Sequence, residues 1–142
     1  MAIVREMMTG NPESVDAQAM VGDAAKVMRE MNVGSVPVVS EGRVAGIVTD
    51  RDIAVRVIAE NRNPTTVRVA DVATANPLTI GPEAAVEEAA RLMAQHQVRR
   101  LPVVEDGRLI GMLSLGDVSV EGNREQAGKA LKEISTPARP ER

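Results

Sequence analysis

Residues 36–53 read VPVVSEGRVAGIVTDRDI, and residues 101–118 read LPVVEDGRLIGMLSLGDV. Both stretches begin with a short apolar run, reach an acidic residue followed by glycine, and continue as a second apolar run that ends in Thr or Ser. An acidic residue followed by glycine is typical of a tight hairpin turn, because glycine accepts a positive φ. Each stretch therefore predicts two antiparallel strands. The four strands are expected at Val36–Val39, Val44–Thr49, Leu101–Val104 and Leu109–Ser114.

The two stretches belong to a longer internal repeat. Residues 4–53 align without a gap on residues 69–118, at a constant offset of 65. Ahead of each hairpin, apolar residues recur at the i, i+3, i+4, i+7 spacing that predicts one buried face of a helix. The residues of this face are Val21, Ala24, Ala25 and Met28 in the first copy, and Val86, Ala89, Ala90 and Met93 in the second. Each copy therefore predicts a helix followed by two strands.

The helix boundaries and the domain organisation follow from the same pattern. Asp16 is the expected N-cap of the first helix, and Pro82 is expected at the first position of its counterpart. A second helix is expected at Asp50–Glu60, with Ile53, Val57 and Ile58 toward the core. The predicted organisation is a first copy at 1–60, a linker at 61–68, a second copy at 69–120, a C-terminal helix at 121–135 and a flexible tail at 136–142.

Composition excludes several functional classes. The 142 residues contain no Phe, Tyr, Trp or Cys and one histidine, His96, and the formal net charge is −3 at pH 7. A chain without cysteine has no disulfide, thiolate zinc site, iron–sulfur cluster or cysteine nucleophile. Missing aromatic rings argue against stacking on single-stranded nucleic acid, and the acidic balance argues against a duplex-binding surface. The single histidine and the lack of cysteine also leave no metal site to be expected, so we expect a protein that binds neither metal nor nucleic acid. Because no signal peptide or membrane span is visible, we expect it to be cytoplasmic and to bind no membrane.

The duplicated order of motifs resembles a tandem pair of cystathionine-β-synthase-type (CBS) domains, also called a Bateman module. The resemblance covers residues 3–118 and is carried by Asn11-Pro12, 33–39, 46–53 and their counterparts 65 residues later. It implies an α+β, sandwich-like fold of two β-α-β-β-α repeats related by pseudo-twofold symmetry, with the small sheets packed together and the helices outside. It also implies clefts between the repeats that bind AMP, ADP, ATP or S-adenosylmethionine as regulatory ligands, with no cofactor required.

The candidate ligand site is a Thr or Ser followed three residues later by Asp, at the end of the second strand. The two pairs are Thr49 with Asp52 and Ser114 with Asp117. The hydroxyl can donate to a phosphate oxygen, and the resemblance implies that the carboxylate accepts from the ribose hydroxyls. Free backbone N–H groups at a helix beginning would favour an anion at the same place. The alternative is an ordinary helix cap, because Thr-x-x-Asp is also a capping pattern.

Basic residues near this site differ between the copies. Arg99 and Arg100 precede the strand of the second copy, where the resemblance implies phosphate-binding side chains, whereas the first copy has Gly34 and Ser35. The resemblance also implies that Arg51 reaches the opposite cleft. We therefore expect the second copy to bind nucleotide more tightly than the first. The alternative for the arginine pair is a solvated position at a helix end.

An adenine ring in this chain would have to pack on aliphatic side chains. The predicted walls of the adenine pocket are Val15, Val36, Ile80 and Leu101. Because any planar apolar ligand fits such walls, they indicate a pocket without identifying its ligand.

Two functions from different classes remain open. The first is a regulatory, ligand-sensing homodimer that passes a shape change to an unknown effector protein in trans. The second is a structural or interaction protein whose clefts bind no nucleotide. An enzyme is not expected, because these residues assemble no nucleophile–base pair or metal set. The homodimer is expected because the helix faces with Val21 and Met28, and with Val86 and Met93, carry more apolar surface than one small domain covers.

Overall fold

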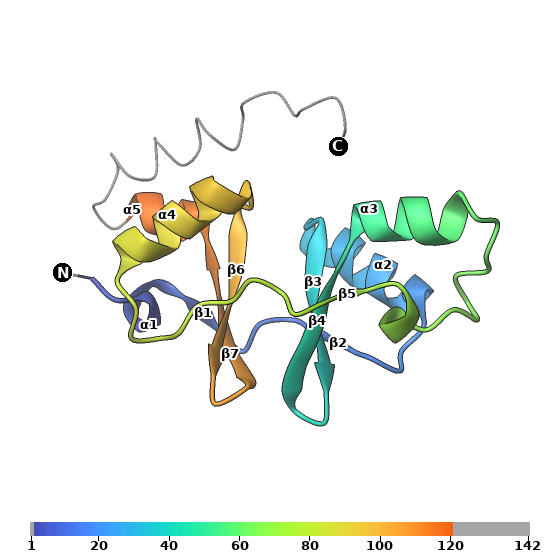
Figure 1. Cartoon of the computed structure of the whole chain (residues 1–142), viewed down its shortest axis with the longest axis horizontal. Helices are drawn as coiled ribbons and strands as arrows, with labels where there is room; N and C mark the ends of the chain where they lie inside the picture. Colours follow the sequence, from blue (N-terminus) through green and yellow to red (C-terminus); the bar gives the residue numbers. More distant parts are fainter. Residues whose placement is uncertain (1, 121–142) are drawn as a thin grey trace. The chain divides into compact units, whose positions relative to one another are not determined.

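The computed structural model of the chain describes residues 2–120, so the helix predicted at 121–135 and the tail predicted at 136–142 lie outside the described residues. The described chain divides into two compact units. The first-repeat unit comprises residues 12–77 and 106–109, and the second-repeat unit comprises residues 2–11, 78–105 and 110–120. Both units contain helices and strands, which confirms the predicted α+β class (Figure 1).

The first-repeat unit is built on a small mixed sheet. The strands lie in the order β2 (Val15–Asp16), β3 (Ser35–Ser40), β4 (Arg43–Thr49) and β5 (Thr74–Ala75). β2 is parallel to β3, and the other neighbours are antiparallel. The helices are α2 (Val21–Met31), α3 (Asp50–Ile53) with its π-helical continuation η1 (Ala54–Ile58), and the 3-10 helix η2 (Val69–Asp71).

The second-repeat unit has the same order of elements. They are α4 (Val86–His96), β6 (Arg100–Glu105), β7 (Arg108–Ser114) and α5 (Leu115–Val120), together with α1 (Val4–Met7) and β1 (Thr9–Gly10) from the beginning of the chain. β7 pairs with β6 and, antiparallel, with β1. Ile80 forms a parallel bridge with Val103, as Val15 does with Val38 in the first-repeat unit. The predicted β-α-β-β-α order therefore holds in both units, while the packing of the two sheets on one another stays a prediction.

The hairpin turns form as predicted. Glu41 and Gly42 have φ values of +52° and +82°, and Asp106 and Gly107 have values of +52° and +80°. Positive φ at both central residues is the requirement of a two-residue type I′ turn. The four predicted strands are confirmed, each one or two residues longer than the apolar run that predicts it.

Both long helices begin later than their sequence patterns predict. α2 has Met20 as its N-cap, because Asp16 lies in β2 and its carboxylate instead accepts from the backbone N–H of Gln18 at 2.8 Å. α4 has Ala85 as its N-cap, three residues after Pro82. The residues before each helix are held extended by a bridge to a distant segment, from Met20 to Arg68 and from Ala85 to Ile3.

Each unit is completed by a segment that begins the other copy in the sequence. Residues 2–10 begin the first copy, but Val4 is fully buried in the second-repeat unit and its N–H donates to the Ala84 carbonyl at 2.9 Å. Residues 67–75 complete the first-repeat unit, where Val69 is fully buried and its N–H donates to the Ala19 carbonyl at 2.8 Å. The compact units therefore exchange segments that the 65-residue repeat assigns to the following copy.

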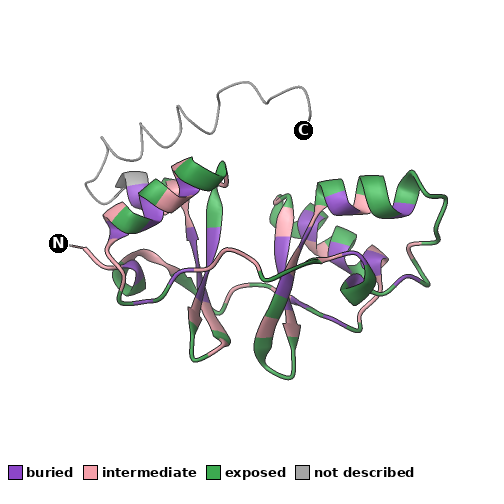
Figure 2. Ribbon diagram, viewed as in Figure 1, coloured by how far each residue is buried: buried purple, intermediate pink, exposed green. Residues whose placement is uncertain are grey.

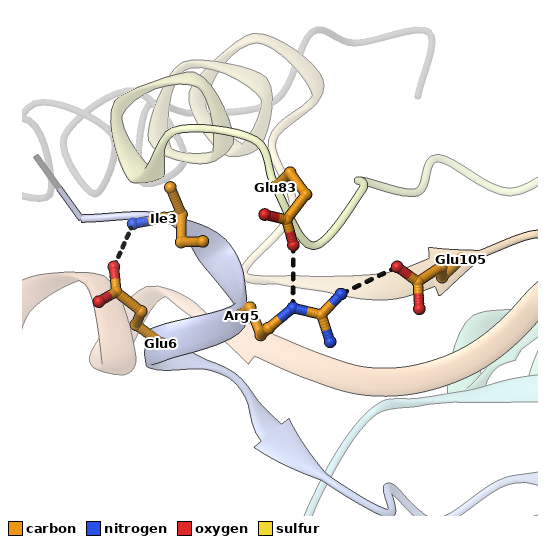
Figure 3. Close-up of polar contacts among 5 residues, drawn as sticks. All are labelled: Ile3, Arg5, Glu6, Glu83 and Glu105. Atoms are coloured by element: carbon orange, nitrogen blue, oxygen red, sulfur yellow. Dashed lines mark hydrogen bonds and ion pairs between the residues drawn. The ribbon is translucent and has the colours of Figure 1, made fainter.

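Charged side chains also connect residues 2–10 to the second-repeat unit (Figure 3). Arg5 Nε lies 2.9 Å from Glu83 Oε2, and Arg5 Nη2 lies 2.8 Å from Glu105 Oε2. The hydrogen bond to Glu83 is the main reason that the pKa of Arg5 is raised. All three side chains are well exposed, and exposed ion pairs contribute little to stability. The burial of Val4 therefore anchors the segment, and Arg5 orients it.

Each unit has its own apolar core, and the predicted helix faces supply much of it. Val21, Met28, Val86 and Met93 are at most 7% exposed, although Ala25 faces solvent. This burial shows that the reason given for a dimer is wrong, because each of these four side chains is covered within its own unit.

The second helix of the first copy departs from its predicted face (Figure 2). Val57 is fully buried and Ile53 is partly buried, but Ile58 is 59% exposed. The reason is the π-helical turn, in which the N–H of Ala59 donates to the Ala54 carbonyl five residues before it. The wider turn rotates the residues away from the faces that a 3.6-residue period predicts.

Candidate functional site

The two predicted pairs lie where β4 and β7 end. Thr49 Oγ1 accepts from the Asp52 N–H at 3.0 Å, and Asp52 Oδ2 accepts from the Thr49 N–H at 2.9 Å. Ser114 and Asp117 exchange the same two hydrogen bonds, at 3.1 Å and 2.9 Å. These reciprocal bonds are capping boxes at the beginnings of α3 and α5, so the capping role is confirmed in both copies.

Each capping box still leaves hydrogen-bonding capacity for a ligand. A hydroxyl that accepts a hydrogen bond keeps its own hydrogen for donation, and within residues 2–120 each carboxylate accepts hydrogen bonds through Oδ2 only. Asp52 Oδ1 lies 3.9 Å from Arg56 Nη1, and the same Nη1 donates to the Val72 carbonyl at 2.8 Å. Asp52 is 8% exposed, whereas Asp117 is partly exposed. A donor and an acceptor, as a ribose phosphate needs, therefore lie three residues apart in each unit.

The backbone donors predicted for an anion are already used. In the first-repeat unit the N–H groups of residues 50–52 donate in turn to the Gly34 carbonyl at 2.9 Å, to Asp50 Oδ1 at 2.8 Å and to Thr49 Oγ1 at 3.0 Å. In the second-repeat unit the N–H of Leu115 donates to the Arg99 carbonyl and the N–H of Asp117 donates to Ser114 Oγ, as their counterparts Asp50 and Asp52 do. The expectation of free N–H groups is therefore wrong at these positions, because the cap and the preceding loop bind them.

The structure brings Arg99 to the second site. The Arg99 carbonyl accepts from the N–H of Leu115, the residue directly after Ser114, at 2.9 Å. Arg99 and Arg100 are both exposed at the beginning of β6, and neither forms an ion pair within the described part of the chain. Arg51 is exposed in α3, and its predicted reach to the other cleft stays a prediction.

A carboxylate occupies the equivalent place in the first-repeat unit. A Cβ added at Gly34 would lie 3.0 Å from Asp50 Oδ2. Where the second-repeat unit has Arg99 and Leu115, the first therefore has Gly34 and Asp50. Sequence reasoning missed Asp50, although a position-by-position comparison of the two copies contains the signal.

The four predicted adenine walls are core residues. Val15 and Val36 belong to the first-repeat core and are 7% and 1% exposed, while Ile80 and Leu101 belong to the second-repeat core and are 6% and 0% exposed. Their burial gives each of them a packing role that needs no ligand. Contact with an adenine stays a prediction for all four.

The other sequence features indicate no metal site or membrane span among residues 2–120. Among residues 2–120, no group of three His, Cys, Asp or Glu side chains is placed to hold a metal ion. His96 is exposed at the end of α4. In the same range, no helix is both long and apolar enough to span a bilayer. The capping boxes and the residues beside them are therefore the candidate site.

Comparison with known proteins identifies the family of the chain. The family model for the CBS domain matches residues 4–59 and again 69–121. The CBS domain-containing protein YhcV of Bacillus subtilis is 40% identical over 136 residues, which cover 95% of this chain and 96% of that protein.

Two solved structures of CBS-domain proteins are similar to this chain in fold. The crystal structure of CBSX2 in complex with AMP is 30% identical with a TM-score of 0.74, and the match covers 89% of this chain and 99% of that one. A hexameric CBS-CP12 protein from bloom-forming cyanobacteria is 30% identical with a TM-score of 0.70, covering 98% of this chain and 77% of that one. With the family matched on both repeats and a relative matched over nearly its whole length, the chain belongs to the CBS domain family and carries two copies of the domain.

Proposed function

We propose that the chain is a regulatory protein that senses an adenine nucleotide, AMP, ADP or ATP, at the second-repeat site. The observation that carries this proposal is the position of an exposed arginine, Arg99, whose carbonyl accepts from the N–H of Leu115, the residue directly after Ser114. The related CBSX2 holds AMP, which supports this ligand class. S-adenosylmethionine, with the same adenosine portion, is the other ligand to be tested.

Each side chain of the site has a separate role in this proposal. Asp117 Oδ1, which accepts no hydrogen bond from the described residues, accepts from the ribose hydroxyls, and the Ser114 hydroxyl donates to a phosphate oxygen. Arg99 neutralises the phosphate and donates to it, because a guanidinium presents several donors in one plane. Arg100 and Arg51 supply further positive charge. The pair of Thr49 and Asp52 forms the weaker, first-repeat site.

The chemistry of these groups supports sensing rather than catalysis. Within the described residues, the hydroxyls and carboxylates of the site are held in capping boxes, and none of them is hydrogen-bonded to a histidine or lysine that could act as a base. Bound ligand would instead alter the site's loops and α5, and an effector protein acting in trans would respond to that change.

One observation favours a second function, that of an interaction protein without a ligand. The capping boxes give Thr49, Asp52, Ser114 and Asp117 a structural role that is complete in the absence of nucleotide. In this alternative the residues are retained for helix capping alone.

Thermal melting separates the two functions. Because the chain has no Trp or Tyr, unfolding is followed by circular dichroism, with millimolar AMP, ADP, ATP or S-adenosylmethionine and with GMP as the control. A ligand at about 100 times its dissociation constant adds about 2.7 kcal/mol, which raises the melting temperature by several degrees. An increase with an adenine nucleotide and none with GMP is expected. Equal melting with every ligand would favour the interaction protein.

We also propose that the chain forms a homodimer, for which the hexameric CBS-CP12 relative is support. Among the described residues, the large apolar side chains that remain exposed are Met31 at 51%, in α2, and Val55 at 46% and Ile58 at 59%, in η1. Light scattering should give about twice the 15.1 kDa chain mass, and Ile58→Glu should reduce it to one chain. Glu60→Gln is the control, and a wild-type particle of one chain at micromolar concentration would contradict the dimer.

A further inference from the structure

We propose that Asp50 excludes phosphate from the first-repeat site, so that this site takes an adenosine-type ligand whose 5′ group carries no negative charge. The inference rests on the proposed function, since it assigns different ligand classes to the two sites. It makes Asp50 a specificity-determining residue rather than part of the ribose-binding pair.

The position of the Asp50 carboxylate carries the argument. The Asp50 N–H donates to the Gly34 carbonyl at 2.9 Å, and the carboxylate lies over Gly34, with Oδ2 3.0 Å from where a Cβ would be. Asp50 Oδ1 accepts from the Arg51 N–H at 2.8 Å. The carboxylate is thus held over Gly34, and it belongs to the residue directly after Thr49, whose hydroxyl would meet a phosphate.

The charge of this carboxylate is not neutralised nearby. Asp50 is exposed and forms no ion pair within the described residues, and the Arg51 guanidinium is not paired with it. The N–H groups of residues 50–52 are all bonded within the unit, so they offer a phosphate no backbone donor. A phosphate at this place would therefore meet a carboxylate without a compensating donor from this backbone.

The second-repeat unit shows the same backbone with the opposite charge. The Leu115 N–H donates to the Arg99 carbonyl, also at 2.9 Å, so Arg99 replaces Gly34 and Leu115 replaces Asp50. The cation Arg99 therefore takes the place of Gly34, which has no side chain, and the apolar Leu115 takes the place of the anion Asp50. A like charge at about 4 Å weakens binding about fivefold in water, and more in less polar surroundings.

The ribose-binding chemistry of the first site is unaffected by this charge. The carboxylate of Asp52 keeps its Oδ1 for a ribose, and Thr49 keeps a hydroxyl hydrogen for a neutral acceptor. Adenosine and AMP share base and ribose and differ in the phosphate, so they are the matched probes for this site.

Calorimetric titration of the full chain carrying Asp117→Ala isolates the first site, because this change removes the ribose acceptor of the second. In that chain we expect adenosine to bind more tightly than AMP. Adding Asp50→Leu, which introduces the residue of the second copy, should raise AMP affinity about tenfold and leave adenosine affinity within about twofold. Adding Gly34→Arg as well should raise AMP affinity further. Asp23→Leu, an exposed acid in α2 of the same unit, is the control for net charge.

The outcomes distinguish this inference from the proposed function. Reversal of the adenosine preference by Asp50→Leu, with circular dichroism showing an intact fold, supports the role of Asp50. If wild type binds AMP but the Asp117→Ala chain binds neither probe, or Asp50→Leu changes nothing, the inference is overturned and the proposed function stands. If wild type binds neither AMP nor adenosine, both are overturned.

Discussion

In the first-repeat unit the N–H of Asp50 donates to the Gly34 carbonyl, and in the second-repeat unit the N–H of Leu115 donates to the Arg99 carbonyl, both at 2.9 Å. The capping boxes that follow these bonds also match within about 0.1 Å. The two repeats therefore share a backbone site and differ in the side chains around it. The cap is therefore common to both units, whereas the exposed positions beside it differ in charge.

Variants in the two exchanged segments, residues 2–10 and 67–75, test whether each unit has a separate core. Val4 and Val69 are equivalent in the repeat and fully buried in different cores. We expect Val4→Asp and Val69→Asp each to reduce the free energy of unfolding by about 4 kcal/mol, because each buries an unpaired charge. Urea unfolding followed by circular dichroism measures this loss, with Ala70→Asp, at the exposed position next to Val69, as the control.

Hydrogen exchange then shows which unit each change loosens. Val4→Asp should increase exchange in α4, and Val69→Asp should increase it in α2. If Val4→Asp loosened α2 first, the assignment of residues 2–10 to the second-repeat unit would be contradicted.

Arg99 tests the charge difference between the two sites. Removing one charge-assisted hydrogen bond to a phosphate costs about 1.5–3 kcal/mol, so Arg99→Ala should weaken AMP binding about tenfold or more. Adenosine binding should change little, because it presents no phosphate. Calorimetric titration with both ligands measures the effect, and Arg91→Ala, an exposed arginine of α4, is the control. An equal loss for AMP and adenosine would show that Arg99 does not act on the phosphate.

Removal of the capping hydroxyls should give the smallest difference in stability between the two repeats. Thr49→Ala and Ser114→Ala each remove the acceptor for one N–H, which costs about 1 kcal/mol of stability. We expect the loss to be larger for Thr49→Ala, because Asp52 is buried and Asp117 is partly exposed. Thermal unfolding measures both losses, and Thr49→Ser, which keeps a hydroxyl, is the control. Unchanged stability in both variants would mean that the capping boxes contribute nothing to folding.

The hairpins and the helix faces could be predicted because their signals are local. Glu41-Gly42 and Asp106-Gly107 specify a turn within two residues, and the apolar spacing around Val21 and Val86 specifies a buried face within two helical turns. The Thr or Ser and Asp pairs are local in the same sense, so their capping role could be predicted from spacing alone.

The other features depend on distant contacts. Nothing in the residues around Val4 indicates that it packs against the second repeat, since Val69 is the same residue in an equivalent place. The late beginnings of α2 and α4 follow from bridges to those same distant segments. Ile58 faces solvent because of a π-helical turn that a 3.6-residue period does not contain. Asp50 is exposed, and its neighbours in the sequence do not indicate that its carboxylate lies over Gly34, so that contact required the structure.

Calorimetric titration with AMP tests the central claim, that the second-repeat site is the nucleotide site, most directly. Wild type should show one dominant site per chain, Asp117→Ala should abolish it, and Asp52→Ala should leave its affinity within a few-fold. Because Thr49 and Ser114 keep their capping hydroxyls in these variants, we expect both variants to fold, and circular dichroism checks this. A larger loss for Asp52→Ala, or no AMP binding by wild type, would contradict the claim and favour the interaction protein.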